Sequence, residues 1–137
     1  MSDDARPTVL VAQMLESVEL ALSYVEGLSV ADFLADRKTQ QAAILNLIVI
    51  GKTASKIERD FPTFALANSH ISWKSMRGMR NRIAHGYFEI DLATVWDTLR
   101  TALTGLQTQL RAIIGKWSPC GASPTQFKCL YGKQTAD

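Results

Sequence analysis

The first segment of the chain has apolar residues that recur at spacings of three and four, namely Leu10, Met14, Val18, Ala21 and Val25. This spacing places them on one face of an α-helix. Pro7 favours a first helical turn, and Gly27 follows the last apolar position. A helix is therefore predicted from about Thr8 to Val25.

The following segments continue the helical pattern. Ser29, with Asp32 three residues later, resembles a capping box and predicts a short helix that ends near Asp36. A longer helix is predicted from Lys38 to Arg59, with Gly51 as a point where a second helix can approach closely. Its apolar face consists of Ile44, Leu47, Ile48, Ala54 and Ile57.

Phe61-Pro62 is expected to end this helix, and residues 63–72 are expected to form a connection. A shorter helix is then predicted from about Trp73 to the terminating Gly86. One of its sides is apolar, and its arginines are distributed around the others. The apolar positions are Met76, Met79 and Ile83.

The clearest helix follows Asp91, which can cap it. Its apolar positions alternate at spacings of four and three: Leu92, Trp96, Leu99, Leu103, Leu106, Leu110 and Ile113. Such a pattern favours a long partner helix, either within the chain or across a dimer seam. Gly115 is expected to close this helix.

The predicted fold class is therefore all-α, an antiparallel bundle of four to five helices. Strand signals such as hairpin dipeptides and period-two alternation are scarce. Residues 1–115 form the predicted helical domain. Residues 116–137 contain two prolines and no sustained period, so they are expected to form a poorly ordered tail.

Composition agrees with a single globular domain, since 47% of the 137 residues are hydrophobic and 20% are charged. No apolar run is expected to reach the ~18 residues that a membrane span requires. The acidic N-terminus, with Asp3 and Asp4, does not resemble a signal peptide. Two cysteines are too few for a disulfide scaffold. A cytoplasmic location is therefore expected.

The net charge of +2 hides an uneven distribution. No acidic residue lies between Asp60 and Glu89, and this stretch contains Lys74, Arg77, Arg80 and Arg82. Such a local excess of positive charge attracts anionic ligands. The alternative is a solvated helix face whose cations pair with acidic residues elsewhere in the fold.

Metal ligation has little support in the sequence. The candidate soft ligands are His70, His85, Cys120 and Cys129, and none of the spacings typical of zinc sites occurs among them. Glycine-rich loops that bind phosphate are also missing from the pattern. Neither a metal nor a cofactor is therefore expected.

One constellation combines groups suited to chemistry: Arg80, then His85 after four intervening residues, then Tyr87 after one more. Arginine offers a planar, permanently charged fork for a phosphate. Histidine titrates near neutrality and can transfer protons. Tyrosine adds a hydroxyl and a ring on which a base can stack.

Helix geometry separates two of these groups. On a regular helix, Arg80 and His85 point about 140° apart, whereas Asn81 and His85 are i, i+4 neighbours. Asn81 is therefore the better candidate for orienting the imidazole. Arg80 and His85 share one cleft only if the site is open-sided or is shared between two subunits. The structural alternative is an arginine that satisfies a helix end and a histidine packed at a C-cap.

The Arg-x4-His-x-Tyr signature within residues 78–91 closely resembles the HEPN superfamily, specifically the HepT-like toxins. Further matching segments are Asp36–Gln40, Asn46-Leu47, Ile50-Gly51, Trp73-Lys74 and Asp91–Trp96. The resemblance covers about residues 8–115 and does not include the tail. It implies an all-helical homodimer in which two copies of the motif face one cleft.

The resemblance also implies a metal-independent endoribonuclease. Arg80 would hold the scissile phosphate, and His85 would act as general base or acid while the RNA 2′-hydroxyl attacks the adjacent phosphorus. The products would be a 2′,3′-cyclic phosphate and a 5′-hydroxyl. Asn81, Arg77 and Arg82 would support the site.

A partner is implied as well. HepT-like toxins pair with a nucleotidyltransferase antitoxin of the MntA type, which transfers AMP to the motif tyrosine, here Tyr87. The attached AMP would bring negative charge and bulk into the cationic cleft and block RNA. Where relatives commonly read Gly-Glu-Ala, this chain reads Gly51-Lys52-Thr53. Lys52 thus either replaces a residue that orders the site or adds to the cationic surface.

Two functions from different classes remain open at this point. The first is a ribonuclease toxin of a toxin–antitoxin pair. The alternative is a non-catalytic helical module that binds nucleotide or docks a nucleotidyltransferase and uses the motif for contacts only. A purely structural dimer is a third, weaker possibility.

Overall fold

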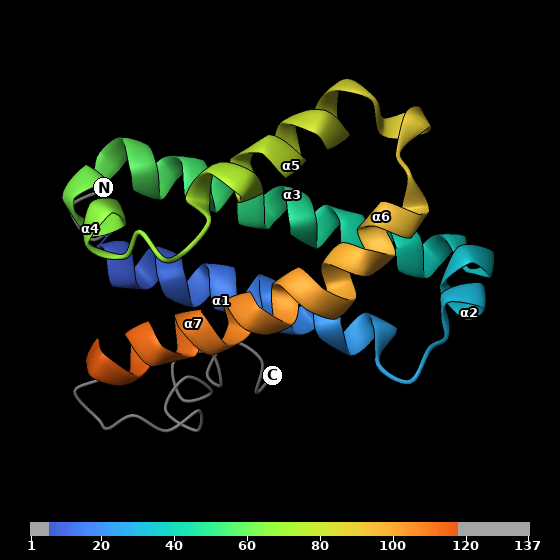
Figure 1. Cartoon of the computed structure of the whole chain (residues 1–137), viewed down its shortest axis with the longest axis horizontal. Helices are drawn as coiled ribbons and strands as arrows, with labels where there is room; N and C mark the ends of the chain where they lie inside the picture. Colours follow the sequence, from blue (N-terminus) through green and yellow to red (C-terminus); the bar gives the residue numbers. More distant parts are fainter. Residues whose placement is uncertain (1–5, 118–137) are drawn as a thin grey trace, which may run out of the picture.

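The computed structural model describes residues 6–117 of the chain. Three of its long helices are α1 (Pro7–Val25), α3 (Arg37–Asp60) and α5 (Trp73–His85). The last long helix is continuous but has three parts: α6 (Leu92–Asp97), the π-helical segment η3 (Thr98–Ala102) and α7 (Leu103–Trp117). The shorter elements are α2 (Val30–Ala35), α4 (Pro62–Ala67) and the 3-10 turn η2 (Tyr87–Glu89). Figure 1 shows α1, α3, α5 and α7 alternating in direction along the molecule. No strand occurs between residues 6 and 117, and the predicted all-α antiparallel bundle is confirmed.

The predicted boundaries of the first helices are confirmed. Gly27 has a φ of 80°, which lets the chain turn sharply after α1. The capping box of α2 is formed: the Asp32 amide donates to Ser29 Oγ at 3.1 Å, and the Ser29 amide donates to the Asp32 carboxylate at 3.1 Å. The Thr39 amide donates to the Asp36 carboxylate at 3.2 Å, so Asp36 caps α3.

The connection predicted for residues 63–72 is only partly correct, because it begins with the short helix α4. Pro62 occupies the first turn of α4, where its fixed φ suits a helix and its missing amide costs nothing. The helix is held by tertiary contacts, since Ala65 is buried and its carbonyl accepts a hydrogen bond from Trp73 Nε1 at 3.2 Å. Six residues without a polar cap carry too weak a local pattern to predict this helix.

The last helix departs from the predicted heptad in its first half. Val95, not Trp96, is fully buried there, and Trp96 packs beside Phe33 with ring centroids 5.3 Å apart. The buried positions are Val95, Leu99, Leu103, Leu106, Leu110 and Ile113. The first two spacings are four and four, because the wider turn of η3 keeps these residues on one face.

The predicted closure at Gly115 is wrong, since α7 continues to Trp117. An isolated glycine costs a helix only about 1 kcal/mol and does not by itself end it. Residues 118–137 of the predicted tail lie outside the described residues.

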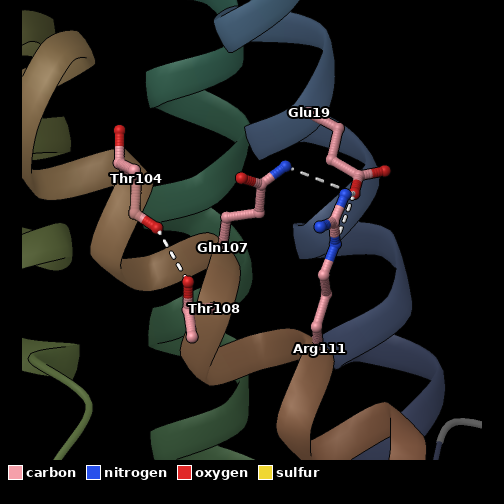
Figure 2. A network of polar contacts seen from close by, with 5 residues as sticks. All are labelled: Glu19, Thr104, Gln107, Thr108 and Arg111. Atoms are coloured by element: carbon pink, nitrogen blue, oxygen red, sulfur yellow. Dashed lines mark hydrogen bonds and ion pairs between the residues drawn. The ribbon is translucent and has the colours of Figure 1, made fainter. Parts of the chain in front are cut away.

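The apolar core lies between α1, α3 and α7. Its largest fully buried side chains include Phe33, Met14, Ile50, Leu99 and Leu110. At the edge of the contact between α1 and α7, the Glu19 carboxylate accepts hydrogen bonds from Arg111 Nη2 at 2.6 Å and from Gln107 Nε2 at 3.4 Å (Figure 2). Helix α5 packs on α3.

Helix α1 corrects one expectation from the sequence. By length and composition alone it is apolar enough to cross a membrane, with a mean hydropathy of 1.3. Half of that window is buried inside the bundle. Its apolar character is therefore accounted for by its central place in the core.

Candidate active site

Helices α3 and α5 come into unusually close contact at Gly51. A Cβ atom at this position would overlap Arg80 Cβ and would lie 2.7 Å from the Met76 carbonyl oxygen and 3.1 Å from Arg80 Cγ. The close approach predicted at Gly51 is therefore confirmed. The structure adds that the residue approached is Arg80.

The stem of Arg80 lies against α3. Its Nε atom is fully buried and has no hydrogen-bond partner among residues 6–117, whereas the residue as a whole is only half-buried. The terminal nitrogens of the guanidinium are therefore the part that a ligand can reach. A guanidinium presented in this way suits a phosphate at the protein surface.

Arg77 lies one turn before Arg80 and, unlike Arg80, is paired with an acidic residue in the described part of the chain. Its Nε atom is 3.1 Å from Glu58 Oε1 on α3. The two atoms form an ion pair whose alignment is outside hydrogen-bond geometry, and neither has a hydrogen-bond partner among residues 6–117. For Arg77, the structure therefore favours pairing with an acidic residue elsewhere in the fold over a free cation that attracts anionic ligands. Sequence analysis missed Glu58, whose only signal is its spacing of seven from Gly51 on the same helix face.

His85 is the last residue of α5 and is exposed. The helix ends there because the Gly86 amide makes the last helical bond, to the Arg82 carbonyl at 3.1 Å. The imidazole therefore stands in solvent, where it can exchange protons with a bound substrate.

Two exposed polar residues of α5 flank His85, namely Asn81 and Arg82. They precede it by four and three residues, so both lie on its side of the helix. The structure, as described for residues 6–117, contains no hydrogen bond between Asn81 and His85. That Asn81 orients the His85 imidazole therefore stays a prediction. Arg82 also borders a cavity of about 480 Å³ between α5 and α7.

Tyr87 and Phe88 form the 3-10 turn that follows His85. Tyr87 is 40% exposed and Phe88 is 97% exposed, and their rings meet edge to face with centroids 5.5 Å apart. Asp91 then caps α6. Its carboxylate accepts a hydrogen bond from Thr94 Oγ1 at 2.8 Å and another from the Ala93 amide at 3.1 Å. These bonds hold the pKa of Asp91 below its usual value, with the Thr94 hydroxyl as the main cause and the Ala93 amide as the second. The sequence pattern gave no particular role to Phe88.

The candidate residues therefore separate into two groups. Arg80 lies on the side of α5 that faces α3, and His85 lies with Asn81 on the outward side. This follows from the 100° turn per helical residue, so one α5 helix does not place Arg80 and His85 side by side. Arg82 lies beside the cavity that α5 shares with α7. Tyr87 lies beyond the end of α5, in the turn η2.

The described part of the chain contains no group of three His, Cys, Asp or Glu side chains placed to hold a metal ion. Cys120 and Cys129, two of the four candidate ligands in the sequence, lie outside residues 6–117.

Comparison with known proteins is consistent with this site. The family model described as "Ribonuclease HepT-like" matches residues 14–113, which include α5 and the motif. "Probable ribonuclease HepT" of Thermococcus cleftensis is 33% identical over 92 residues, covering 67% of this chain and 81% of its own length. "Putative RNase TTE0752" of Caldanaerobacter subterraneus subsp. tengcongensis is 26% identical over 110 residues, covering 80% of this chain and 96% of its own. No solved structure matches the chain.

An all-helical bundle with an Arg-x4-His-x-Tyr motif at the end of one helix is the arrangement expected of a HEPN-type ribonuclease. The chain belongs to the HepT-like ribonuclease family, because the family model spans most of its described residues.

Proposed function

We propose that this protein is a metal-independent endoribonuclease and the toxin component of a toxin–antitoxin pair. The observation that carries the proposal is the HepT-like match across α5, where His85 is exposed and Arg80 has the reachable end of its guanidinium at the surface. These are the two groups that metal-free cleavage of RNA requires: a proton-transfer group and a fixed positive charge.

In the proposed reaction, His85 accepts the proton of the RNA 2′-hydroxyl as the 2′-oxygen attacks the adjacent phosphorus. The bond from phosphorus to the 5′-oxygen breaks, and the leaving oxygen takes up a proton. A 2′,3′-cyclic phosphate and a 5′-hydroxyl result. The Arg80 guanidinium offsets the negative charge that grows on the phosphate oxygens in the transition state.

The separation of Arg80 from His85 on α5 supports a homodimeric active unit. Two α5 helices that face one cleft would place Arg80 of one protomer near His85 of the partner subunit. The shared cleft would then contain both reactive groups, although each chain has a single copy of the motif. Sedimentation of the purified protein tests this, because a strictly monomeric species that cleaves RNA would contradict it.

Cleavage is tested with purified protein and a mixed-sequence RNA in EDTA. We expect 2′,3′-cyclic phosphate ends, and a loss of rate of about 10²–10⁴-fold in His85→Ala and of about 10²–10³-fold in Arg80→Ala. His70→Ala and Arg59→Ala are matched controls, because both residues are exposed and lie outside the site. Wild-type protein that leaves RNA intact but binds nucleotide would favour the non-catalytic module instead.

We further propose that a nucleotidyltransferase antitoxin of the MntA type modifies Tyr87. The phenolic oxygen would attack the α-phosphorus of ATP, with pyrophosphate as the leaving group. The exposed position of Tyr87 near His85 supports this, since AMP there would bring negative charge to the RNA-binding surface.

This modification is tested by co-expression with the nucleotidyltransferase and mass spectrometry. We expect added AMP on the peptide that contains Tyr87 and none in Tyr87→Phe. Tyr24→Phe is the matched control, because Tyr24 is 39% exposed against 40% for Tyr87. Neutralised toxicity with an unmodified Tyr87 peptide would mean that the antitoxin acts by occlusion.

A further inference from the structure

The contact between α3 and α5 contains buried polar side-chain atoms. Within residues 6–117, Ser55 Oγ and Arg80 Nε are buried without a hydrogen-bond partner. Arg77 Nε and Glu58 Oε1 are also buried and are paired only with each other, as an ion pair at 3.1 Å. Buried polar atoms without partners reduce stability. A contact of this kind needs an explanation beyond packing.

Gly51 sets the distance between the two helices at this contact. Any side chain there would overlap Arg80 Cβ and crowd the Met76 carbonyl oxygen. The Met76 carbonyl belongs to the backbone of α5, so it moves only if the helix moves. A larger residue at position 51 therefore has to displace α5 and the Arg80 stem together.

Other helical glycines provide a comparison. A Cβ atom at Gly78 on α5 or at Gly105 on α7 would meet no neighbouring element within 4 Å in the described part of the chain. Glycine is unfavourable inside a helix relative to alanine, and the surroundings of those two positions accept alanine. Position 51, by contrast, requires glycine for the close approach of Arg80.

We infer that Gly51 is a positioning residue for Arg80, which rests on the proposed ribonuclease function. The backbone of α3 at Gly51 holds the Cβ and Cγ atoms of Arg80. The Nε atom is thereby buried, and the guanidinium is left with its terminal nitrogens directed outward. One half of the active site is therefore defined by α3, although α3 contributes no reactive group to it.

Arg80 Nε provides a direct readout of this arrangement. A buried N–H exchanges with water more slowly than an exposed one. In the wild-type protein, the Nε–H signal of Arg80 in a ¹⁵N spectrum, assigned through Arg80→Lys, is expected to exchange more slowly than that of exposed Arg82. Equal exchange of the two signals would overturn the inference without any variant of Gly51.

The substitution Gly51→Ala is the main test, with Gly78→Ala as its matched control. We expect Gly51→Ala to lose the exchange protection of Arg80 Nε–H and to lower kcat about 10- to 100-fold, since misplacing a catalytic group by ~1 Å costs on that order. The KM for RNA should change much less than kcat. Gly78→Ala should retain both the protection and the wild-type kcat.

The outcomes separate this inference from the proposed function. Cleavage lost in Gly51→Ala while Arg80 Nε–H stays protected would overturn the positioning role and leave the ribonuclease intact. Protection lost in Gly51→Ala while wild-type protein leaves RNA uncut would support the positioning and refute the ribonuclease. If Gly51→Ala does not fold, the comparison of Arg80 with Arg82 in the wild-type protein still decides.

Discussion

The contact of α1 with α7 and the contact of α3 with α5 differ in the side chains that form them. The first buries apolar side chains such as Met14 and Leu110 completely, and the Glu19 carboxylate at its edge is bonded to Arg111 and Gln107 (Figure 2). The second places Arg80, whose buried Nε atom has no hydrogen-bond partner within residues 6–117, beside Gly51. The α1–α7 contact is thus arranged for stability, and the α3–α5 contact keeps a less stable arrangement that presents Arg80.

This difference indicates where substitutions affect folding and where they affect chemistry. Truncation in the α1–α7 contact should lower the free energy of unfolding and leave the rate per folded molecule unchanged. Removal of the Arg80 guanidinium from the α3–α5 contact should lower the cleavage rate and leave the free energy of unfolding nearly unchanged. The following substitutions test that separation.

The largest expected effect on stability is that of Leu110→Ala, because Leu110 is fully buried. Removal of a buried leucine side chain costs about 2–5 kcal/mol of the free energy of unfolding, measured by urea denaturation. Leu66→Ala is the control, since Leu66 is 76% exposed and its truncation should stay within about 0.5 kcal/mol. A fall in cleavage per folded molecule in Leu110→Ala would break the separation.

Arg80→Met tests the opposite contact. Methionine keeps much of the length of the stem and removes the buried, partnerless Nε atom. The free energy of unfolding should therefore stay unchanged or rise by up to about 1 kcal/mol, while the cleavage rate falls by about 10²–10³-fold. A large loss of stability would show that Arg80 is chiefly a structural residue.

Glu19→Gln should have a smaller effect. The side chains of Glu19 and Arg111 are 30% and 49% exposed, so solvent screens their attraction. We expect a loss of about 0.5–1 kcal/mol that shrinks in high salt. Cleavage should be unaffected, and a loss that is independent of salt would argue against an ionic origin.

The smallest expected effect is on stability at acid pH and comes from Asp91, which caps α6. The pKa of Asp91 is lowered, first by the Thr94 hydroxyl and then by the Ala93 amide. A depressed folded-state pKa stabilises the protein above the unfolded pKa of about 3.9, and that contribution is lost as pH falls through the lower folded value. In Asp91→Asn, the melting temperature should therefore change less between about pH 5 and pH 3 than in wild type. An identical acid dependence would exclude this carboxylate as its source.

Much of the fold follows from local patterns. The ends of α1, α2, α3 and α5 agree with the prediction because Pro7, Ser29, Asp36 and Gly86 act within one turn of chain. The motif of Arg80, His85 and Tyr87 is likewise found from its spacing, and its interpretation as a site rests on the resemblance to HepT-like proteins. The helix α4 and the segment η3 were missed, because the burial of Ala65 and the fit of Val95 in the core are tertiary effects.

By itself, the sequence determined the longer helices and the Arg-x4-His-x-Tyr spacing of Arg80, His85 and Tyr87, since each depends on periodicity or on neighbouring residues. The tertiary structure alone decided that Arg77 pairs with Glu58 and that Gly51 meets Arg80. Both contacts join α3 to α5 across more than a dozen residues of chain, and helix packing sets them. No local rule of spacing or propensity describes that packing.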